Sequence, residues 1–251
     1  MTAGRAPGTT LRVVTWNVHG LRAGADVVAG VLREVGCDVA LLQEGPRGLR
    51  TLPRAADLAR RAGMLVAAAG RPAAGAVVLV AARLDVLAAS AAELPVRGLR
   101  SPVRGSATAL VAPPGRTSVV VSSAHLGLSD GERADHVRRL QGLPADVAGR
   151  APAGVPRVVG VDLNERPGGP SWATLLPDAE DCWAVAGRDG DGATYPAAHP
   201  RQRIDALLVR GARVLATSVP AVGGASDHRP VVADLAVGGP GDRRDLPGGG
   251  R

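Results

Sequence analysis

The sequence has no lysine, no phenylalanine and only two cysteines, and aromatic residues make up 2% of its 251 positions. Two cysteines are too few for a disulfide framework or a four-thiolate zinc site. The shortage of aromatic rings disfavours a protein that binds nucleic acid by stacking bases on exposed side chains. No apolar run is long enough to span a bilayer, and residues 1–10 lack the apolar core of a signal peptide. We therefore expect a cytoplasmic protein without integral membrane association.

The chain has a large positive net charge, but this charge is only weak evidence for an anionic partner. All 30 basic residues are arginines, and the formal net charge is +7. Such a balance usually indicates a nucleic acid or another polyanion as partner. Here the arginines accompany very many alanines, glycines and prolines, which is the pattern that a GC-rich coding sequence leaves on any protein. The charge therefore counts only slightly toward nucleic acid.

The length and the 45% hydrophobic fraction fit one large α/β domain with a substantial core. Short apolar runs bounded by Gly, Pro and Asp predict strands over residues 11–16, 38–42, 76–82, 107–112, 118–122, 157–161, 204–209, 214–218 and 230–235. Helical spacing predicts helices over 25–35 and 51–62, and Ser129 with Glu132 forms a capping box for a third. Several strands between residues 74 and 124 come one after another without a helix. That order excludes a simple alternating parallel sheet and favours antiparallel pairs covered by helices.

The domain boundaries rest on the same patterns. We expect a single domain over residues 11–236, since no composition break or internal repeat divides the chain. Residues 237–251 are rich in Gly, Pro and Arg and have nothing to bury, which predicts a disordered tail. We expect the protein to be a monomer.

Polar side chains stand at the ends of several predicted strands, where a buried strand would be expected to continue apolar. They are Asn17, Glu44, His125, Asp162, Asn164, Asp205, Asp227 and His228. The two asparagines in this set are the only two in the chain. Any one of these residues alone is as readily a turn former or a structural pair. Together at one edge, the carboxylates would be costly without a ligand, and an oxygen-rich set without thiolates suits Mg²⁺ or Mn²⁺.

Six short motifs occur in a characteristic order: TWNVHG, LLQE, AHLGLSDGER, GVDLN, RIDALLV and SDHRPVV. In combination they resemble the endonuclease/exonuclease/phosphatase superfamily of metal-dependent phosphoester hydrolases. The resemblance runs from about Val13 to Leu235 and implies a four-layer α/β sandwich, with two mixed β-sheets packed face to face and helices on the outside. The predicted strands agree with this fold class.

The resemblance also implies a role for each polar strand end. Glu44 would be the central metal ligand for Mg²⁺ (or Mn²⁺), with Asn17 and Asp227 beside it. At the scissile phosphate, Asp162 would orient or activate the attacking water and Asn164 would donate its amide to a phosphoryl oxygen. His228 would be the acid/base or phosphate-contacting imidazole, and Asp205 would hold its ring. His125 would be a second histidine at the phosphate.

The other histidines and one arginine receive less weight. His19 is at least as readily a loop residue as a site residue, His136 is expected to be solvated on its helix, and His199 lies on a proline-rich loop. Arg104 stands where some members of the superfamily carry a phosphate-binding arginine. Tyr195, the only tyrosine, lies away from the segment that carries the active-site tyrosine of the abasic-site endonucleases.

The function that these residues imply is hydrolysis of a phosphate ester by in-line attack of water, with a phosphodiester preferred and nucleic acid, such as DNA, as one candidate substrate. Phosphatases and phospholipid phosphodiesterases of the superfamily remain alternatives, because loops rather than the core select the group that is attached to the phosphate. A noncatalytic binding module on the same fold is the alternative of another class. Such a module would be expected to have lost some of the polar strand ends, and this chain keeps them.

Overall fold

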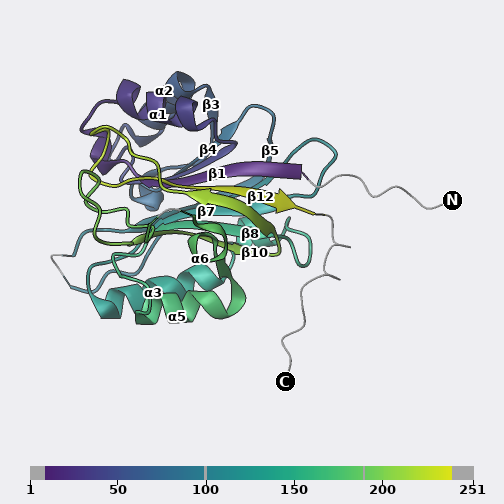
Figure 1. Ribbon diagram of the computed structural model, residues 1–251. Helices are drawn as coiled ribbons and strands as arrows, with labels where there is room; N and C mark the ends of the chain where they lie inside the picture. The colour runs from purple at the N-terminus through teal and green to yellow at the C-terminus, as the bar shows by residue number, and fades with distance from the viewer. Residues whose placement is uncertain (1–8, 99–100, 189, 239–251) are drawn as a thin grey trace.

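The computed structural model describes residues 9–98, 101–188 and 190–238 of the chain, and its centre consists of two mixed six-stranded sheets (Figure 1). The first sheet has the strand order β11-β12-β1-β2-β4-β3. Its strands are β1 (Thr9–Asn17), β2 (Val39–Gln43), β3 (Met64–Ala68), β4 (Val77–Ala81), β11 (Arg213–Ser218) and β12 (Val231–Val237). Strand β1 pairs parallel to β2 and antiparallel to β12, so the two ends of the described chain meet in the middle of this sheet.

The second sheet has the order β5-β6-β7-β8-β10-β9. Its strands are β5 (Asp85–Glu93), β6 (Gly105–Ala112), β7 (Val119–His125), β8 (Arg157–Asp162), β9 (Glu180–Asp181) and β10 (Asp205–Arg210). Only β7 and β8 run parallel, and the other pairs are antiparallel. The helix-free stretch predicted between residues 74 and 124 is confirmed for β4 to β7, which succeed one another directly.

Alternation along the strands explains why the sheets pack face to face. In β2, Val39 and Leu41 belong to the core between the sheets, whereas Ala40 and Leu42 belong to the cluster on the outer face. This is the period of two that places successive side chains on opposite faces. Strands from both sheets contribute to the central core, and all of β2 is buried.

Helices cover the two outer faces, which makes four layers (Figure 1). The first sheet is covered by α1 (Ala25–Val35) and α2 (Thr51–Ala62). The second sheet is covered by α3 (Asp130–Gln141), α4 (Ala145–Ala148) and α5 (Pro170–Leu175). Helix α6 (Cys182–Ala186) packs beside β10 and β11. Short 3₁₀ turns span His19–Leu21, Arg71–Ala73 and Leu176–Asp178. Helices α1 and α2 end at Gly36 and Gly63, whose left-handed backbone glycine adopts without steric cost.

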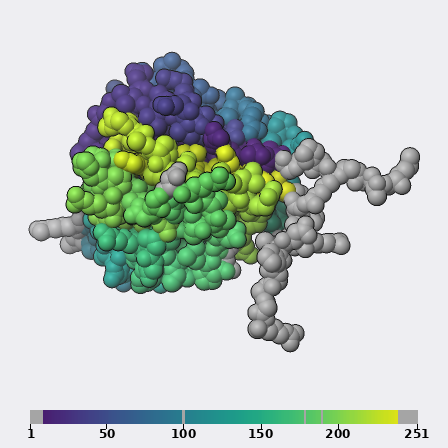
Figure 2. Space-filling model, in the orientation of Figure 1, coloured from purple at the N-terminus to yellow at the C-terminus, as the bar shows by residue number. Residues whose placement is uncertain are grey.

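The fold class predicted from the sequence is therefore confirmed. In Figure 2 the purple and blue N-terminal part forms the upper half and the green and teal middle part the lower half, with the yellow-green C-terminal segment between them. The bounds of α1 and α2 are those predicted, whereas β3, β5 and the two-residue β9 were not predicted. Strand β12 extends to Val237, and residues 239–251 of the predicted tail lie outside the described residues. Within the described ranges, no helix combines the length and apolar character of a bilayer-crossing segment.

Candidate active site

Strand register brings the predicted polar residues to one edge of the sandwich. In the first sheet Asn17 pairs with Gln43, so Glu44, the residue after β2, lies next to the end of β1. In the second sheet Asp162 is flanked by His125 on one side and by Asp205 on the other, each directly opposite it in the ladder.

The two edges join through a buried hydrogen bond between the sheets. The Asn17 Nδ2 amide donates to Asp162 Oδ2 at 2.9 Å, and both residues are almost fully buried. A pocket of about 290 Å³ opens here. It is lined by Asn17, Glu44, Arg104, His125, Leu128, Asp162, Asn164, Tyr195, Gln202, Ile204, Asp227 and His228. All the predicted site residues except Asp205 thus line one pocket, although the roles assigned to them stay predictions.

Asp205 lies behind the pocket and holds His228. Its Oδ2 accepts from His228 Nδ1 at 2.8 Å and from the Thr194 hydroxyl at 2.5 Å. The Trp16 indole donates to the His228 carbonyl at 2.9 Å, and the Tyr195 ring lies against the imidazole with 4.8 Å between ring centroids. The ring of His228 is therefore fixed in orientation from several sides, with Nδ1 bound to Asp205.

Charge around His228 overcomes the effect of burial. Burial alone lowers the pKa of a histidine, but the carboxylates of Asp205, Asp162 and Asp227 raise the pKa of His228 to about 9. His228 is therefore an imidazolium at neutral pH, and it can donate a hydrogen bond or place positive charge next to an anionic group.

His125 is the opposite case. Arg104 NH1 lies 3.0 Å from its Nδ1, and because a guanidinium only donates, Nδ1 must accept and the ring must be neutral. Burial is the main cause that lowers the pKa of His125 to about 3, and the charges of Arg104 and Arg47 act in the same direction. Its Nε2 lies 3.4 Å from Asp162 Oδ2 and 3.0 Å from the side-chain amide of Asn164.

Asp162 lies between the two histidines. Burial, together with the nearby Asp205 carboxylate, raises the pKa of Asp162 above the ordinary aspartate value. Its Oδ1 accepts from the backbone N–H of Asn164 at 3.0 Å, which closes a turn in which Asn164 takes the left-handed φ of 50°. A non-glycine residue in that region is uncommon, and asparagine tolerates it better than most residues.

Two groups of side chains in this pocket could hold a metal ion. One comprises Asp162, Asp205 and His228, whose ligand atoms lie within 4.8 Å of one another. Both Asp162 oxygens and Asp205 Oδ2 already accept hydrogen bonds, and the His228 imidazolium repels a cation. Asp205 Oδ1 is the one carboxylate oxygen of this group that has no partner among the described residues. The other comprises the oxygens predicted from the sequence, on Asn17, Glu44 and Asp227.

The oxygens of the second group are partly engaged: Asn17 Oδ1 accepts from the backbone N–H of His19 at 3.0 Å, and Asp227 Oδ1 accepts from the Ser226 hydroxyl at 3.4 Å. The Glu44 carboxylate accepts no short hydrogen bond among the described residues, and His125 Nδ1 is 3.9 Å from it. Asp227 Oδ1 lies 3.3 Å from His19 Nδ1. His19, for which the sequence favours a loop role at least as much as a role in the site, therefore borders the site. Because Glu44 and Asp227 are only partly buried, an ion could reach them from solvent.

Several residues of the site were missed or misjudged in the sequence. Thr194 and Tyr195 lie in a loop, and no local pattern marks them. Arg104, given little weight among 30 arginines, is 8% exposed and lines the pocket, and its Nε has no hydrogen-bond partner among the described residues. The expectation that His136 is solvated is wrong: it is 1% exposed, accepts from Gly127 N at 3.1 Å and lies 2.7 Å from the Pro95 carbonyl.

Comparisons with known proteins bear on the family and the fold of the chain. The family model described as "Endonuclease/Exonuclease/phosphatase family" matches residues 14–228. Among solved structures, a protein of that family from Bacteroides thetaiotaomicron has a TM-score of 0.77 at 16% identity, covering 92% of this chain and 99% of that chain. No curated protein matches the chain.

Two further structures carry more specific names. Mannosyl-6-phosphatase Bt3783 from Bacteroides thetaiotaomicron has a TM-score of 0.74 at 16% identity, over 90% of this chain and 99% of that one. D. rerio TDP2, complexed with single strand DNA product, has a TM-score of 0.69 at 17% identity, over 91% of this chain and 100% of that one. At these identities the likeness shows a shared fold.

Proposed function

The chain belongs to the endonuclease/exonuclease/phosphatase family, and from this premise we propose that it is a divalent-metal-dependent hydrolase of phosphoesters, with phosphodiesters preferred. The observation that carries the proposal is one pocket lined by a charged histidine, a neutral histidine, a buried aspartate of raised pKa and a partly buried glutamate. These groups meet the needs of phosphoryl transfer, which depends mainly on positioning and on neutralising charge.

Glu44, with the side-chain oxygens of Asn17 and Asp227, would hold the ion. Their chemistry fits Mg²⁺ or Mn²⁺, since all three offer oxygen ligands and only two of them carry charge. When bound, such an ion neutralises charge on the phosphoryl oxygens and lowers the pKa of coordinated water.

The side chains of the protein then divide the remaining work. The His228 imidazolium, oriented by Asp205, places positive charge on a nonbridging phosphoryl oxygen. The Asn164 amide and the neutral His125 bind the phosphate from the other side of Asp162. Asp162 orients the attacking water and takes its proton, for which a carboxylate of raised pKa is better suited than an ordinary one. As the water oxygen bonds to phosphorus, the ester bond on the opposite side breaks, and the leaving group departs to solvent, where its oxygen takes up a proton.

The class of phosphate ester that the protein hydrolyses depends on the groups around the pocket. The named neighbours include a sugar phosphatase and a protein with a DNA product, so the shared fold accommodates both monoesters and nucleic acid. In this chain Arg104 lines the pocket near His125 and adds a second cation for the phosphate. A noncatalytic binding module on the same fold is the competing hypothesis, and its expected feature, loss of one or more polar strand ends, is missing.

The proposal is tested with a generic diester, bis(4-nitrophenyl) phosphate, and the monoester 4-nitrophenyl phosphate, each with Mg²⁺ and with a chelator. Hydrolysis requires Mg²⁺ and falls at least about a hundredfold in Asp162→Asn and in His228→Gln, the scale expected for a positioned acid/base group. His199→Gln is the matched control, since His199 is exposed and outside the pocket. Plasmid DNA, an abasic oligonucleotide and a choline phospholipid then separate the substrate classes. Activity that survives both site substitutions, or turnover of no ester at all, contradicts the proposal.

A further inference from the structure

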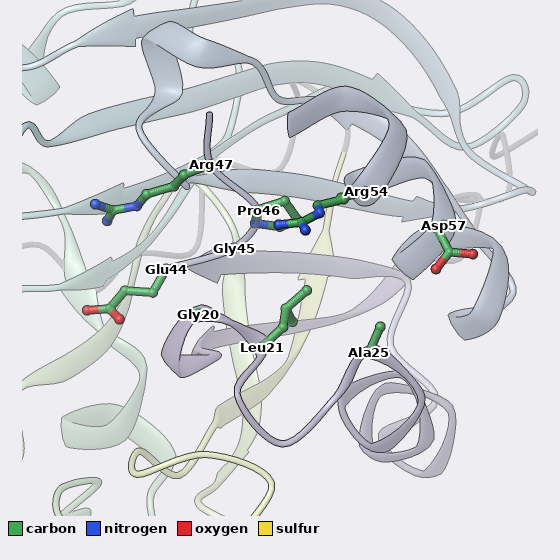
Figure 3. Close-up of a pocket in the computed structure, with 9 residues that line it drawn as sticks. All are labelled: Gly20, Leu21, Ala25, Glu44, Gly45, Pro46, Arg47, Arg54 and Asp57. Carbon is green, nitrogen blue, oxygen red and sulfur yellow. The ribbon is translucent and has the colours of Figure 1, made fainter. Parts of the chain in front are cut away.

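A second, larger pocket adjoins the first. It has a volume of about 610 Å³, within the range of organic ligand sites, and Glu44 lines both pockets. Figure 3 shows this groove between the turn that carries Gly20 and Leu21 and the segment from Glu44 to α2. A molecule whose phosphate lies at Glu44 can therefore extend into the groove without leaving the surface of the protein.

The charges in the groove leave two cations uncompensated. Asp57 accepts from Arg61 Nε at 2.7 Å and from Arg60 NH2 at 2.9 Å, and these bonds hold the pKa of its carboxyl below the usual range. The charge of Asp57 is thus already compensated. Arg47 and Arg54 are both exposed, and neither forms an ion pair within the part of the chain that the structure describes.

The two arginines occupy different positions along the groove. In Figure 3 the guanidinium of Arg47 reaches toward the side on which the Glu44 carboxylate lies, whereas that of Arg54 lies beside Pro46, nearer the middle. The charge of Arg47 also contributes to the lowered pKa values of His125 and Arg104, after burial in each case, which places it electrostatically next to the catalytic pocket. Arg54 is the cation farther from the reaction.

We propose that this groove is a subsite for a second phosphate of the substrate, bound by Arg47 and Arg54 while the scissile phosphate lies at Glu44. The inference rests on the proposed function and narrows its substrate class to organic phosphate esters that carry an additional phosphate. Arginine suits this task because its guanidinium is always charged and matches phosphate oxygens in pairs. Leu21, Ala25 and Pro46 line the same groove and provide apolar contact for the carbon skeleton between the phosphates.

The test uses two chromogenic esters that differ only in the second phosphate: the 4-nitrophenyl ester of thymidine 5′-phosphate, with and without a 3′-phosphate. In the unchanged protein the 3′-phosphorylated ester has a KM lower by on the order of tenfold, as expected for charge-assisted hydrogen bonds. Arg54→Ala abolishes most of that ratio, and Arg54→Lys restores part of it. Arg50→Ala is the control, since Arg50 is exposed on the same segment and does not line the groove.

A binding measurement separates failure of the subsite from failure of the proposed function. Calorimetric titration of thymidine 3′,5′-bisphosphate and of thymidine 5′-phosphate needs no turnover, and the bisphosphate binds the unchanged protein more tightly by a similar factor, which Arg54→Ala removes. If neither ester is hydrolysed but the bisphosphate preference holds, the proposed function fails and the subsite stands. Equal KM values and equal affinities in the unchanged protein, or a preference that Arg54→Ala leaves intact, overturn the subsite.

Discussion

His125 and His228 occupy similar places in the sequence, each at the end of an apolar strand or just before one, yet their environments drive their protonation apart. Burial beside Arg104 keeps His125 neutral, with a pKa of about 3. Three carboxylates hold His228 charged, with a pKa of about 9. Divergent pKa values of neighbouring groups are the usual way in which one site provides both a neutral and a charged partner at neutral pH.

The charge of His228 can be tested directly through its partner. In Asp205→Asn the largest carboxylate contribution is lost while burial remains, so the pKa of His228 falls clearly from its value of about 9. Thr194→Val is the matched control, because it removes a hydrogen bond to Asp205 without removing charge. NMR titration of the imidazole in the metal-free protein measures both. A pKa that stays near 9 in Asp205→Asn would show that Asp205 is not the main cause.

At the scale of single residues, the sequence reveals the polar side chains that end a strand but not the loops that fold over them. Asp162 and Asn164 could be found because short polar side chains interrupt a buried run. Thr194 and Tyr195 reach the site from a loop whose path depends on tertiary contacts, so nothing local marks them. A position on a capped helix predicts a solvated His136, whereas its ring accepts from the backbone N–H of Gly127, just before α3, and lies 2.7 Å from the carbonyl of Pro95, 41 residues away.

Among the elements, β8 approaches the first sheet closely at Gly160. Gly160 faces Leu41 and Thr15 of the first sheet, and a Cβ at this position would lie 2.7 Å from both Leu41 Cβ and Thr15 Oγ1. A glycine within a strand usually weakens it, and here the missing side chain lets the backbone of β8 approach β1 and β2. The positions of Asp162 at the end of β8 and of Asn17 at the end of β1 depend on that distance.

Two glycine-to-alanine substitutions should therefore change the free energy of unfolding in opposite directions. Gly160→Ala forces the sheets apart and lowers the free energy of unfolding by about 1–3 kcal/mol or more, the usual range for overpacking. Gly30→Ala, in the interior of α1, meets only Arg33 NH2 at 3.9 Å and raises that free energy by roughly 0.5–1 kcal/mol. Urea denaturation of the two variants checks this. Equal stability of Gly160→Ala and the unchanged protein would mean that the sheets separate freely.

The elements that could be predicted from the sequence are those with a clear periodicity of apolar residues or a clear capping residue. Residues 25–35 and 51–62 show the helical apolar face, and both helices have these bounds. Strand β5 was missed because its mostly alanine and serine residues are half-exposed and lack alternation, and β3 because MLVAA comes after α2 without a break except Gly63. Both pair antiparallel with a stronger neighbour, so their conformation depends on β6 and β4 rather than on their own residues.

In the molecule as a whole, the buried ionisable groups make stability depend on pH in both directions. His125 has a folded pKa of about 3, below the unfolded value of 6.5, so the unfolded chain binds its proton first and stability falls as pH drops below about 6.5. His228 has a folded pKa of about 9, above the unfolded value of 6.5. Its contribution is fully present below pH 6.5 and is lost as pH rises through about 9. With respect to these two groups, the metal-free protein is most stable near pH 6.5.

Of these two histidines, His228 causes the loss of stability at alkaline pH, and a substitution at this position can test that contribution separately. His228→Asn leaves Asp205 and Asp162 without their cation, so the variant is less stable than the unchanged protein at pH 6.5. Since the unchanged protein loses the contribution of His228 by pH 9.5, the gap in unfolding free energy between the two narrows there by on the order of 3 kcal/mol. Urea denaturation with chelator at the two pH values measures the gap, and His199→Asn provides the exposed-histidine control. A gap that is the same at both values would mean that His228 is not held charged by the carboxylates, and the phosphate-binding role proposed for it would lose its physical basis.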